Sequence, residues 1–255
     1  KYLGVKYAFS FNSGRSSLYA ILLALNLPKG SDVFLQAFTC NAVPNPILWA
    51  RLNPVYIDCD DNFNMDISSL RAIAKQSNVL VLQHTFGLPA DIEKITSIVR
   101  QNGDILIEDC AHALGAEING NPSTSLRARK VGTLGKAAFF SFSRDKVISC
   151  VYGGMAVTND DDIGKKLGEL QKKFGQPSSF WILQQILHPI LLHYFILPLY
   201  NFIDLGKIFL IISQWLHVLS KAVSWKEKIG LRPDYFPKAL PNALAVMAFN
   251  QFEKL

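Results

Sequence analysis

The 255-residue sequence predicts an α/β fold of three layers, in which helices cover both faces of a mainly parallel, mixed sheet. Short runs of consecutive apolar residues, such as residues 79–82, are typical of strands that are buried on both faces. Segments with helical periodicity separate these runs, which is typical of parallel strands joined by crossover helices. With 49% hydrophobic and 18% charged residues, the composition excludes a disordered chain.

The strands and helices are expected mainly within the first 160 residues. Each expected strand is a short run rich in Val, Ile, Leu, Phe or Tyr, and each expected helix places apolar residues three or four positions apart. Ser13 and Gly14 interrupt the first strand pattern before a helix begins. The expected strands cover residues 7–11, 32–35, 54–57, 79–82, 104–107, 137–140 and 155–157, and the expected helices cover residues 16–27, 45–51 and 91–102.

The chain is expected to divide into three parts. Residues 1–165 form the core domain, residues 166–235 an apolar helical segment, and residues 236–255 the start of a C-terminal helix. Within the middle part, residues 180–219 are mostly apolar, and two residues, an Asp and a Lys, carry their only formal charges. Three placements remain open for this stretch: helices in the core or at a subunit interface, helices on a membrane surface, or a spanning helix, which needs roughly 20 apolar residues.

Charge and cysteine content exclude several classes of protein. The net charge of +6 comes from scattered basic residues, without the stripe or motif of a nucleic-acid-binding surface. The four cysteines are far apart and include no C-x-x-C pair, so neither a disulfide framework nor a zinc site is expected. Reduced thiols, and residues 1–11 that lack the apolar core of a signal peptide, indicate a cytoplasmic protein. Residues 180–219 would then be its surface for peripheral membrane contact.

Residues 12–17, Asn-Ser-Gly-Arg-Ser-Ser, connect the first expected strand to the first expected helix. Gly14 permits a tight turn, and the free backbone amides at a helix start form a binding site for an anion. The same residues also suit an ordinary helix start in which Ser13 is the cap. No G-x-x-x-x-G-K-[ST] or G-x-G-x-x-G sequence supports binding of a nucleoside triphosphate or a dinucleotide.

An acidic pair, of which Asp109 is the second residue, follows the expected strand at residues 104–107. A carboxylate at the carboxyl end of a parallel strand can hold a cationic ligand atom, and Asp109 alone could also cap a following helix. Cys110 and His112 are metal-ligating types without a second pair, so no metal site is expected. His84, at the end of another strand, is expected to be a hydrogen-bonded structural histidine.

Lys146 lies between the apolar run at residues 137–140 and a glycine pair, Gly153 and Gly154. A lysine in these surroundings is a candidate to form a Schiff base with an aldehyde cofactor. A solvated loop lysine would show the same local pattern, so the residues near Lys146 do not decide between the two interpretations.

Together, these features resemble the DegT/DnrJ/EryC1/StrS family of pyridoxal-phosphate-dependent sugar aminotransferases, which have the aspartate aminotransferase-like fold type I. The matching stretches, in family order over roughly residues 1–160, are SFNSGRSSLYAILLAL, PVYIDCD, QHTFGLPADI, ILIEDCAHALGA, FFSFSRDK and GGMAV. The resemblance implies that pyridoxal 5′-phosphate is the cofactor. It also implies that the family's small C-terminal domain is largely missing from these residues.

The resemblance assigns a role to each matching residue. Lys146 forms the Schiff base and later moves a proton, and Asp109 pairs with the pyridine nitrogen so that the ring can take up electrons. Backbone amides at the helix start and a serine hydroxyl hold the phosphate, and side chains on both sides pack against the ring. The residues implied to bind the cofactor are Ser13, Gly14, Arg15, Phe38, Asp109, Ala111, His112, Ser141 and Lys146, with Lys146 and Asp109 as the catalytic pair.

The sequence departs from the family pattern in two places. Arg15 stands where the family usually has Thr, and His112 occupies a position where many members have Gln, near the 3′-oxygen of the cofactor. An Asn-x-Arg segment, which contacts the phosphate of the partner subunit in the family, is expected before the late helix. Residues 236–239, Phe-Pro-Lys-Ala, replace it.

The resemblance implies an aminotransferase that moves an amino group from an amino acid, glutamate, to a keto-sugar carried on a nucleotide. It also implies a homodimer with a shared active site, so that residues 1–255 alone are not expected to be an active monomer. Two alternatives remain open. One is a sugar dehydratase that uses the same cofactor, whose relatives replace the lysine, and the other is a non-catalytic, membrane-associated homologue.

Overall fold

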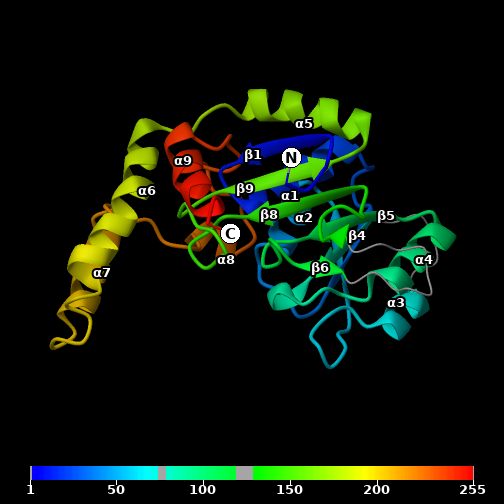
Figure 1. The fold of residues 1–255 in the computed structure, drawn as a ribbon, viewed down its shortest axis with the longest axis horizontal. Helices are drawn as coiled ribbons and strands as arrows, with labels where there is room; N and C mark the ends of the chain where they lie inside the picture. The colour runs from blue at the N-terminus through cyan, green and yellow to red at the C-terminus, as the bar shows by residue number, and fades with distance from the viewer. Residues whose placement is uncertain (1, 74–78, 119–128, 255) are drawn as a thin grey trace.

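The computed structural model describes residues 2–73, 79–118 and 129–254 (Figure 1). Its main sheet has seven strands in the order β1–β9–β8–β5–β4–β2–β3. Neighbours from β8 to β3 are parallel, whereas β9 is antiparallel to both β1 and β8. The strands are β1 (Tyr7–Phe11), β2 (Asp32–Gln36), β3 (Asn53–Ile57), β4 (Val79–Gln83), β5 (Ile105–Asp109), β8 (Ala137–Ser141) and β9 (Gly154–Thr158), with β6 (Glu117–Ile118) and β7 (Arg129–Lys130) in a separate ribbon. The predicted mainly parallel, mixed sheet is confirmed.

Helices cover both faces of the sheet, as a three-layer fold requires. Val33 and Leu35 of β2 pack into the core on one face, and Phe34 between them packs into the core on the other. Both faces of the strands are therefore buried, which explains their continuous apolar sequences. The first face carries α1 (Gly14–Leu25), α2 (Pro44–Trp49) and α5 (Asp161–Phe174), and the second carries α3 (Ile67–Ile73), α4 (Ile92–Asn102), α9 (Asn242–Phe252) and the start of α6 (Ser179–Leu191).

All predicted strands and helices are present, and each begins and ends within two residues of its prediction. The first helix ends before its predicted end because Asn26 adopts a left-handed backbone conformation, with a φ of 52°. Sequence analysis did not place α3 or α5. The expected boundary at residue 165 lies inside α5, whose Ile163 and Leu167 pack in the same core as α1. The division into domains stays a prediction.

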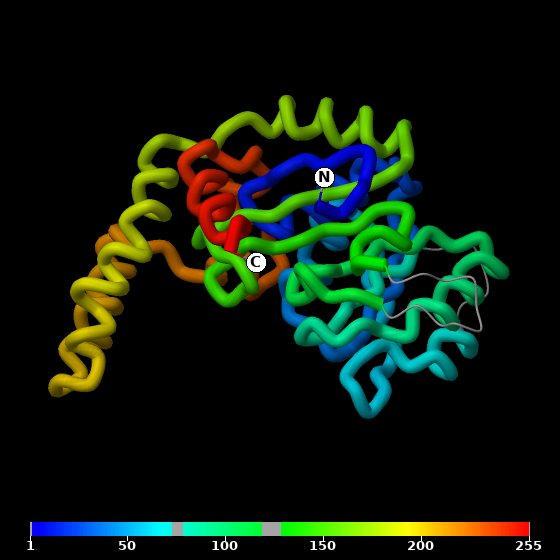
Figure 2. The backbone as a smooth tube through the Cα atoms, in the orientation of Figure 1, coloured from blue at the N-terminus to red at the C-terminus, as the bar shows by residue number. Residues whose placement is uncertain are grey.

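Beyond α5 the chain forms a helical hairpin of α6, a π-helical turn η2 (Leu192–Ile196) and α7 (Leu205–Trp215). Figures 1 and 2 show this hairpin projecting away from the sheet. The inner half of α6 is anchored, because the ring of Trp181 packs against Tyr152 and Tyr235 at 5.4 and 6.3 Å. Of the placements left open for residues 180–219, burial in the core therefore applies only to the inner half of α6. Among the described residues, no helix combines the length and the apolar content that crossing a membrane requires.

After the hairpin, the chain returns to the sheet through the short helix α8 (Trp225–Lys228). Ala239 forms a β-bridge with Phe11 at the end of β1, and the backbone amide of Asn12 donates to the carbonyl of Lys238 at 2.9 Å. The segment that replaces the family's Asn-x-Arg sequence thus contacts the beginning of α1 in its own chain.

Candidate active site

The carboxyl ends of two neighbouring strands and the start of α1 meet at one edge of the sheet. β5 ends at Asp109, and β8 ends at Ser141. Gly14 lies directly against Ser141, since a Cβ atom at position 14 would be 3.0 Å from the Ser141 Cβ. These three residues line a cavity of about 620 Å³, in the position where parallel α/β sheets bind ligands.

The turn before α1 presents backbone amides to this cavity. Ser13 is the N-cap of α1, and its hydroxyl accepts a hydrogen bond from the amide of Ser16 at 3.0 Å. The amides of Gly14 and Arg15 have no hydrogen-bond partner among the described residues. The structure confirms Ser13 as the cap, and the first amides remain available for an anion, so the predicted anion site is compatible with the cap.

Asp109 is buried at the cavity, and its side chain accepts a hydrogen bond from the amide of Ala111 at 2.9 Å. Burial raises the pKa of Asp109 to about 6, against the opposing effects of this hydrogen bond and of the charge on Lys146. The following residues form turns, so Asp109 caps no helix. A buried carboxylate with a raised pKa lacks a cationic partner, and this location suits a protonated ring nitrogen.

The side chain of Lys146 enters the same cavity and is 12% exposed. Its Nζ atom hydrogen-bonds Nε2 of His112 and lies 3.2 Å from the carboxylate of Asp145. Burial, and then the charge of Lys146, lower the pKa of His112 below its usual value. His112 is therefore neutral at pH 7, and its Nε2 atom can accept a hydrogen bond from the Lys146 ammonium group and orient it.

Aromatic side chains form one wall of the cavity. The ring of Phe38 lies 4.8 Å from that of Phe63 and 6.0 Å from that of Phe86. Phe86 in turn stacks on His112 at 5.7 Å. Phe38 was expected at the cofactor ring, whereas Phe86 was not, although its stretch QHTFGLPADI matched the family pattern. The wall can bind a planar group by stacking.

A sequence model of the DegT/DnrJ/EryC1/StrS aminotransferase family matches residues 1–181, which include the turn, Asp109 and Lys146. The chain belongs to this family. GDP-perosamine synthase of Caulobacter vibrioides is 33% identical over 183 residues, which are 71% of this chain and 47% of that protein. UDP-N-acetyl-3-dehydro-alpha-D-glucosamine 3-aminotransferase of Acidithiobacillus ferrooxidans is 34% identical over 66% of this chain and 44% of its own length.

Solved structures of aminotransferases share the fold. An aminotransferase from Psychrobacter cryohalolentis superimposes with a TM-score of 0.61 and 28% identity, over 71% of this chain and 44% of that chain. This chain therefore spans about half the length of the curated relatives and structures that it matches.

The cavity fits the pyridoxal cofactor that the family uses. It combines unpaired amides at one end, a buried carboxylate at the floor and an amine beside it. In addition, Nε of Arg144, which lines the cavity, is buried without a hydrogen-bond partner among the described residues. An anionic ligand would complement such a guanidinium. Cys110 and His112, the two metal-ligating types in this stretch, lie apart in function, because His112 hydrogen-bonds Lys146 while Cys110 lies in a buried cluster with His84 and Glu108.

Arg15, which departs from the family pattern, has a structural partner. Its guanidinium forms an ion pair with Glu227, a fully buried residue of α8, and donates to the carbonyl of Ala222 at 3.3 Å. It also lies 4.9 Å from the ring centroid of Phe236. Only the backbone amide of Arg15 is therefore available to a phosphate, while its side chain fixes the segment that returns from the hairpin.

Arg144 is a residue that sequence analysis did not select. Its Nη2 atom donates to the hydroxyl of Ser220 at 2.5 Å, and the Ser220 hydroxyl donates to Gln185 of α6 at 2.6 Å. Arg144 thereby connects the lysine loop to the hairpin. A signal was present, because Arg144 lies inside FFSFSRDK, but its partners are distant in the sequence.

A glycine in β9 allows the turn to approach the sheet. Gly154 pairs with both Phe11 and Ser141, and a Cβ atom at this position would lie 2.4 Å from the carbonyl carbon of Ser13. Gly154→Ala is expected to destabilise the protein by about 1–3 kcal/mol and to lower its affinity for pyridoxal phosphate at least tenfold. Thermal unfolding and a fluorescence titration with the cofactor measure both effects.

The control for this variant is Gly168→Ala in α5, where the new Cβ atom would meet only the ring of Phe9 at 3.2 Å. That variant is expected to leave the cofactor affinity unchanged. Equal losses of affinity in the two variants would contradict the assigned role of Gly154.

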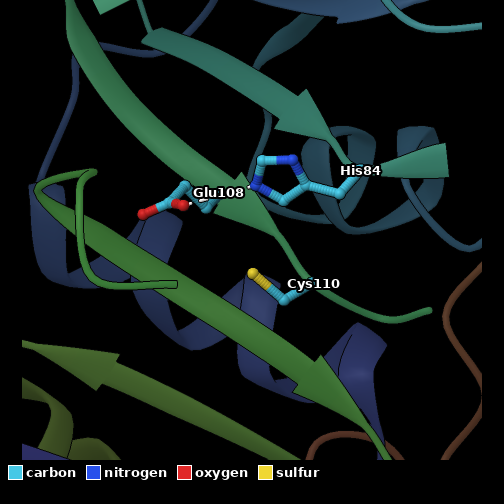
Figure 3. Close-up of side chains that lie close together, drawn as sticks. All are labelled: His84, Glu108 and Cys110. Atoms are coloured by element: carbon cyan, nitrogen blue, oxygen red, sulfur yellow. Dashed lines mark hydrogen bonds and ion pairs between the residues drawn. The ribbon is translucent and has the colours of Figure 1, made fainter. Parts of the chain in front are cut away.

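Behind the cavity, His84, Glu108 and Cys110 form a buried cluster (Figure 3). Nδ1 of His84 accepts from the amide of Ala90 at 3.2 Å, and Nε2 lies 3.3 Å from a carboxylate oxygen of Glu108. Both ring nitrogens are thus occupied, which confirms His84 as a hydrogen-bonded structural residue. The carboxylate of Glu108 also accepts hydrogen bonds from three backbone amides of a loop, those of Gly132, Leu134 and Gly135, at 2.8, 2.7 and 2.6 Å.

Glu108→Gln is expected to destabilise the protein by about 2–4 kcal/mol at pH 7. The substitution replaces one acceptor oxygen with an NH₂ group, which cannot accept the hydrogen bonds that the loop amides and His84 donate. Burial by itself raises the pKa of Glu108, but the hydrogen bonds from His84 and the loop outweigh burial and leave the pKa below its usual value. A carboxylate with a lowered pKa stabilises the fold above pH 4.5, and this stabilisation is lost as the pH falls further. Denaturant unfolding at pH 7 and pH 3.5 should show the difference between variant and wild type shrinking.

Proposed function

We propose that this chain provides the cofactor-binding domain of a pyridoxal-phosphate-dependent aminotransferase that moves an amino group from glutamate to a keto-sugar carried on a nucleotide. The observation that carries the proposal is the position of Lys146. Its Nζ atom lies in one cavity with Asp109, the unpaired amides of the α1 turn and Ser141. This combination supports amine chemistry on an aldehyde cofactor rather than a solvated loop lysine.

Each residue of the cavity has a defined task in this proposal. The amides of Gly14 and Arg15, with the Ser141 hydroxyl, bind the phosphate group. The carboxylate of Asp109 holds a proton on the ring nitrogen, and Ala111 and Phe38 keep the ring in place. When bound, the cofactor supplies an aldehyde and a ring that takes up electrons from the bond broken at the substrate carbon.

Lys146 then acts as the proton carrier. Its amine would take up the proton released at the substrate carbon and hold it beside the bound cofactor, whose carbon would receive it. His112 holds the Nζ atom in position through their hydrogen bond. On the aromatic side of the cavity, the rings of Phe38 and Phe86 would stack on the planar ring of the cofactor.

The names of two relatives support the substrate class. One is a GDP-perosamine synthase and the other a 3-aminotransferase of a UDP-linked sugar. A cavity of about 620 Å³ is larger than the cofactor alone needs, which leaves room for part of a sugar. The homodimer with a shared site, and glutamate as the donor, belong to the same proposal.

A visible absorption spectrum of the full-length protein with pyridoxal phosphate tests the proposal. Adding glutamate should convert the aldehyde form of the cofactor into its amine form, and adding a nucleotide-linked keto-sugar should restore the first spectrum. A sugar dehydratase would instead eliminate water from the nucleotide sugar, and its product would carry no amino group from glutamate. A spectrum that does not respond to amino acids would contradict an aminotransferase.

A further inference from the structure

The outer hairpin, defined as residues 190–216, exposes an unusual amount of apolar surface. Fifteen of its large apolar side chains are exposed, from 37% for Phe209 to 79% for Ile203. The largest apolar patch on a typical monomeric protein is about 300–600 Å². Fifteen such side chains exceed this area, so the outer hairpin must be covered by a partner.

In the hairpin helix α7, apolar side chains face outward and small or polar residues face inward. In α7, Ile208, Ile211 and Ile212 are exposed, whereas Gly206 and Ser213 are buried. Gly206 is required at the contact, because a Cβ atom there would lie 2.2 Å from the carbonyl oxygen of Ile196. A helix on a water-exposed surface has the opposite arrangement, with apolar residues inward and polar residues outward.

In α6, the buried polar residues face the core domain. Leu183 and Ile190 are exposed, while Gln185 and His188 on the other side are buried. The amide of Gln185 donates to the carbonyl of Trp181 at 3.1 Å and accepts from the hydroxyl of Ser220. The arrangement of α7, with Gly206 and Ser213 inward and apolar residues outside, is typical of helices in a lipid environment.

The tip of the hairpin is mostly apolar and almost entirely exposed. Every residue from His193 to Leu205 except Ile196 is exposed. A protein partner with a fixed surface covers one face, whereas lipid chains surround a projecting segment on all sides. The charges of the hairpin, Asp204 and Lys207, neutralise each other in an ion pair of 2.7 Å.

Basic residues follow where the hairpin returns to the sheet. Lys221 and Lys228 are exposed there, beside Trp225, which is 66% exposed. The acidic residue of α8, Glu227, is buried in its ion pair with Arg15 and does not cancel their charge. Lysines and tryptophan next to an apolar segment complement the anionic headgroups and the interface of a bilayer.

We propose that the outer hairpin inserts into the interfacial layer of an anionic lipid bilayer, with its apolar tip among the acyl chains and Lys221 and Lys228 at the headgroups. The chain would thereby work at a membrane surface as a monotopic protein. This inference does not depend on the aminotransferase activity, because it rests on the hairpin and its flanking residues.

Flotation of the full-length protein with vesicles tests the proposal. Vesicles of phosphatidylcholine and phosphatidylglycerol in a 3:1 ratio (about 25% anionic lipid) should carry the protein to the top of the gradient. The variant Ile203→Ser/Ile211→Ser/Trp215→Ser should lose at least tenfold in partitioning. Lys221→Gln/Lys228→Gln should weaken binding to these vesicles and leave the weaker binding to pure phosphatidylcholine unchanged.

The control variant Tyr56→Ser/Val246→Ser/Phe249→Ser removes three apolar side chains from other surfaces, all more than half exposed, at 51%, 57% and 60%. It should bind vesicles as the wild type does, and circular dichroism should show all variants folded. As a second measurement, vesicles should shift the tryptophan emission to shorter wavelengths, and Trp215→Phe should reduce this shift.

Three results would overturn the proposal. The first is that the wild type stays at the bottom of the gradient. The second is that the control variant loses as much binding as the hairpin variant. The third is that the hairpin variant keeps its vesicle binding while sedimentation shows a dimer becoming a monomer, which would assign the hairpin to a second copy of the chain.

Discussion

Lys146→Ala is expected to lower turnover by several orders of magnitude. The variant lacks both the amine that attaches the cofactor and the carrier that moves the proton, and these two functions cannot be replaced separately. The phosphate-binding amides and Asp109 remain, so the variant should still bind pyridoxal phosphate non-covalently. Steady-state kinetics and a cofactor titration measure the two properties independently.

Borohydride reduction of the wild type, followed by peptide mapping, should place the cofactor covalently on Lys146. Lys94→Ala is the matched control, because Lys94 is an exposed lysine of α4 that pairs with Asp91 far from the cavity. It should leave turnover unchanged. Labelling of another lysine, or normal turnover in Lys146→Ala, would remove Lys146 from its proposed role.

Asp109→Asn is expected to lower turnover roughly 10² to 10³-fold while improving the stability of the cofactor-free protein. The amide has the shape of the carboxylate but does not favour a protonated ring nitrogen. Unchanged turnover would mean that Asp109 only organises the turn through its hydrogen bond to Ala111.

The stability effect of Asp109→Asn follows from the direction of its pKa shift. Burial raises the pKa of this carboxyl from 3.8 to about 6, so the folded wild type loses stability as the pH rises from about 4 to 6. Asparagine carries no such charge, and two pKa units correspond to about 3 kcal/mol. At pH 7 the cofactor-free variant should therefore unfold at higher denaturant concentration than the wild type, and the two should converge below pH 4.

The adjacent carboxylate provides a control for this argument. Glu108→Gln is expected to destabilise, because Glu108 is satisfied by loop amides and His84, whereas Asp109 has a single such hydrogen bond from the described backbone. Replacing each of these neighbouring carboxylates by its amide should therefore change stability in opposite directions: Glu108→Gln lowers it and Asp109→Asn raises it. If both variants lose stability, the inference that the buried charge of Asp109 destabilises the cofactor-free protein would be wrong.

The parts of the fold that could be predicted from sequence were those with local signals. Continuous apolar runs identified the buried strands, and Ser13 with Gly14 identified the start of α1. α5 was not placed, although Asp160 caps it and lysines end it, because the strand pattern stopped before it. The outward-facing residues of the hairpin could not be predicted, since apolar helices look alike in the sequence whether they are buried or exposed.

The same distinction applies to the site. Asp109 and Lys146 lie in motifs that adjoin strand ends, and the structure brings both to one cavity. Phe86 and Arg144 lie in matching stretches too, but their roles depend on contacts with His112 and Ser220. Glu227 gave no signal, because its partner Arg15 is 212 residues away.

The position of β1 at the edge of the sheet has a consequence for folding during synthesis. Its one partner strand in the described sheet is β9, in a register that joins Tyr7 to Thr158. The turn before α1 therefore reaches its final place only after residue 158 has left the ribosome. Until then, β8 is an unpaired apolar edge, which can pair with other chains. Slow translation or truncation just before Gly154 should consequently increase aggregation of the nascent chain, whereas the α3 and α4 side of the sheet can already be folded.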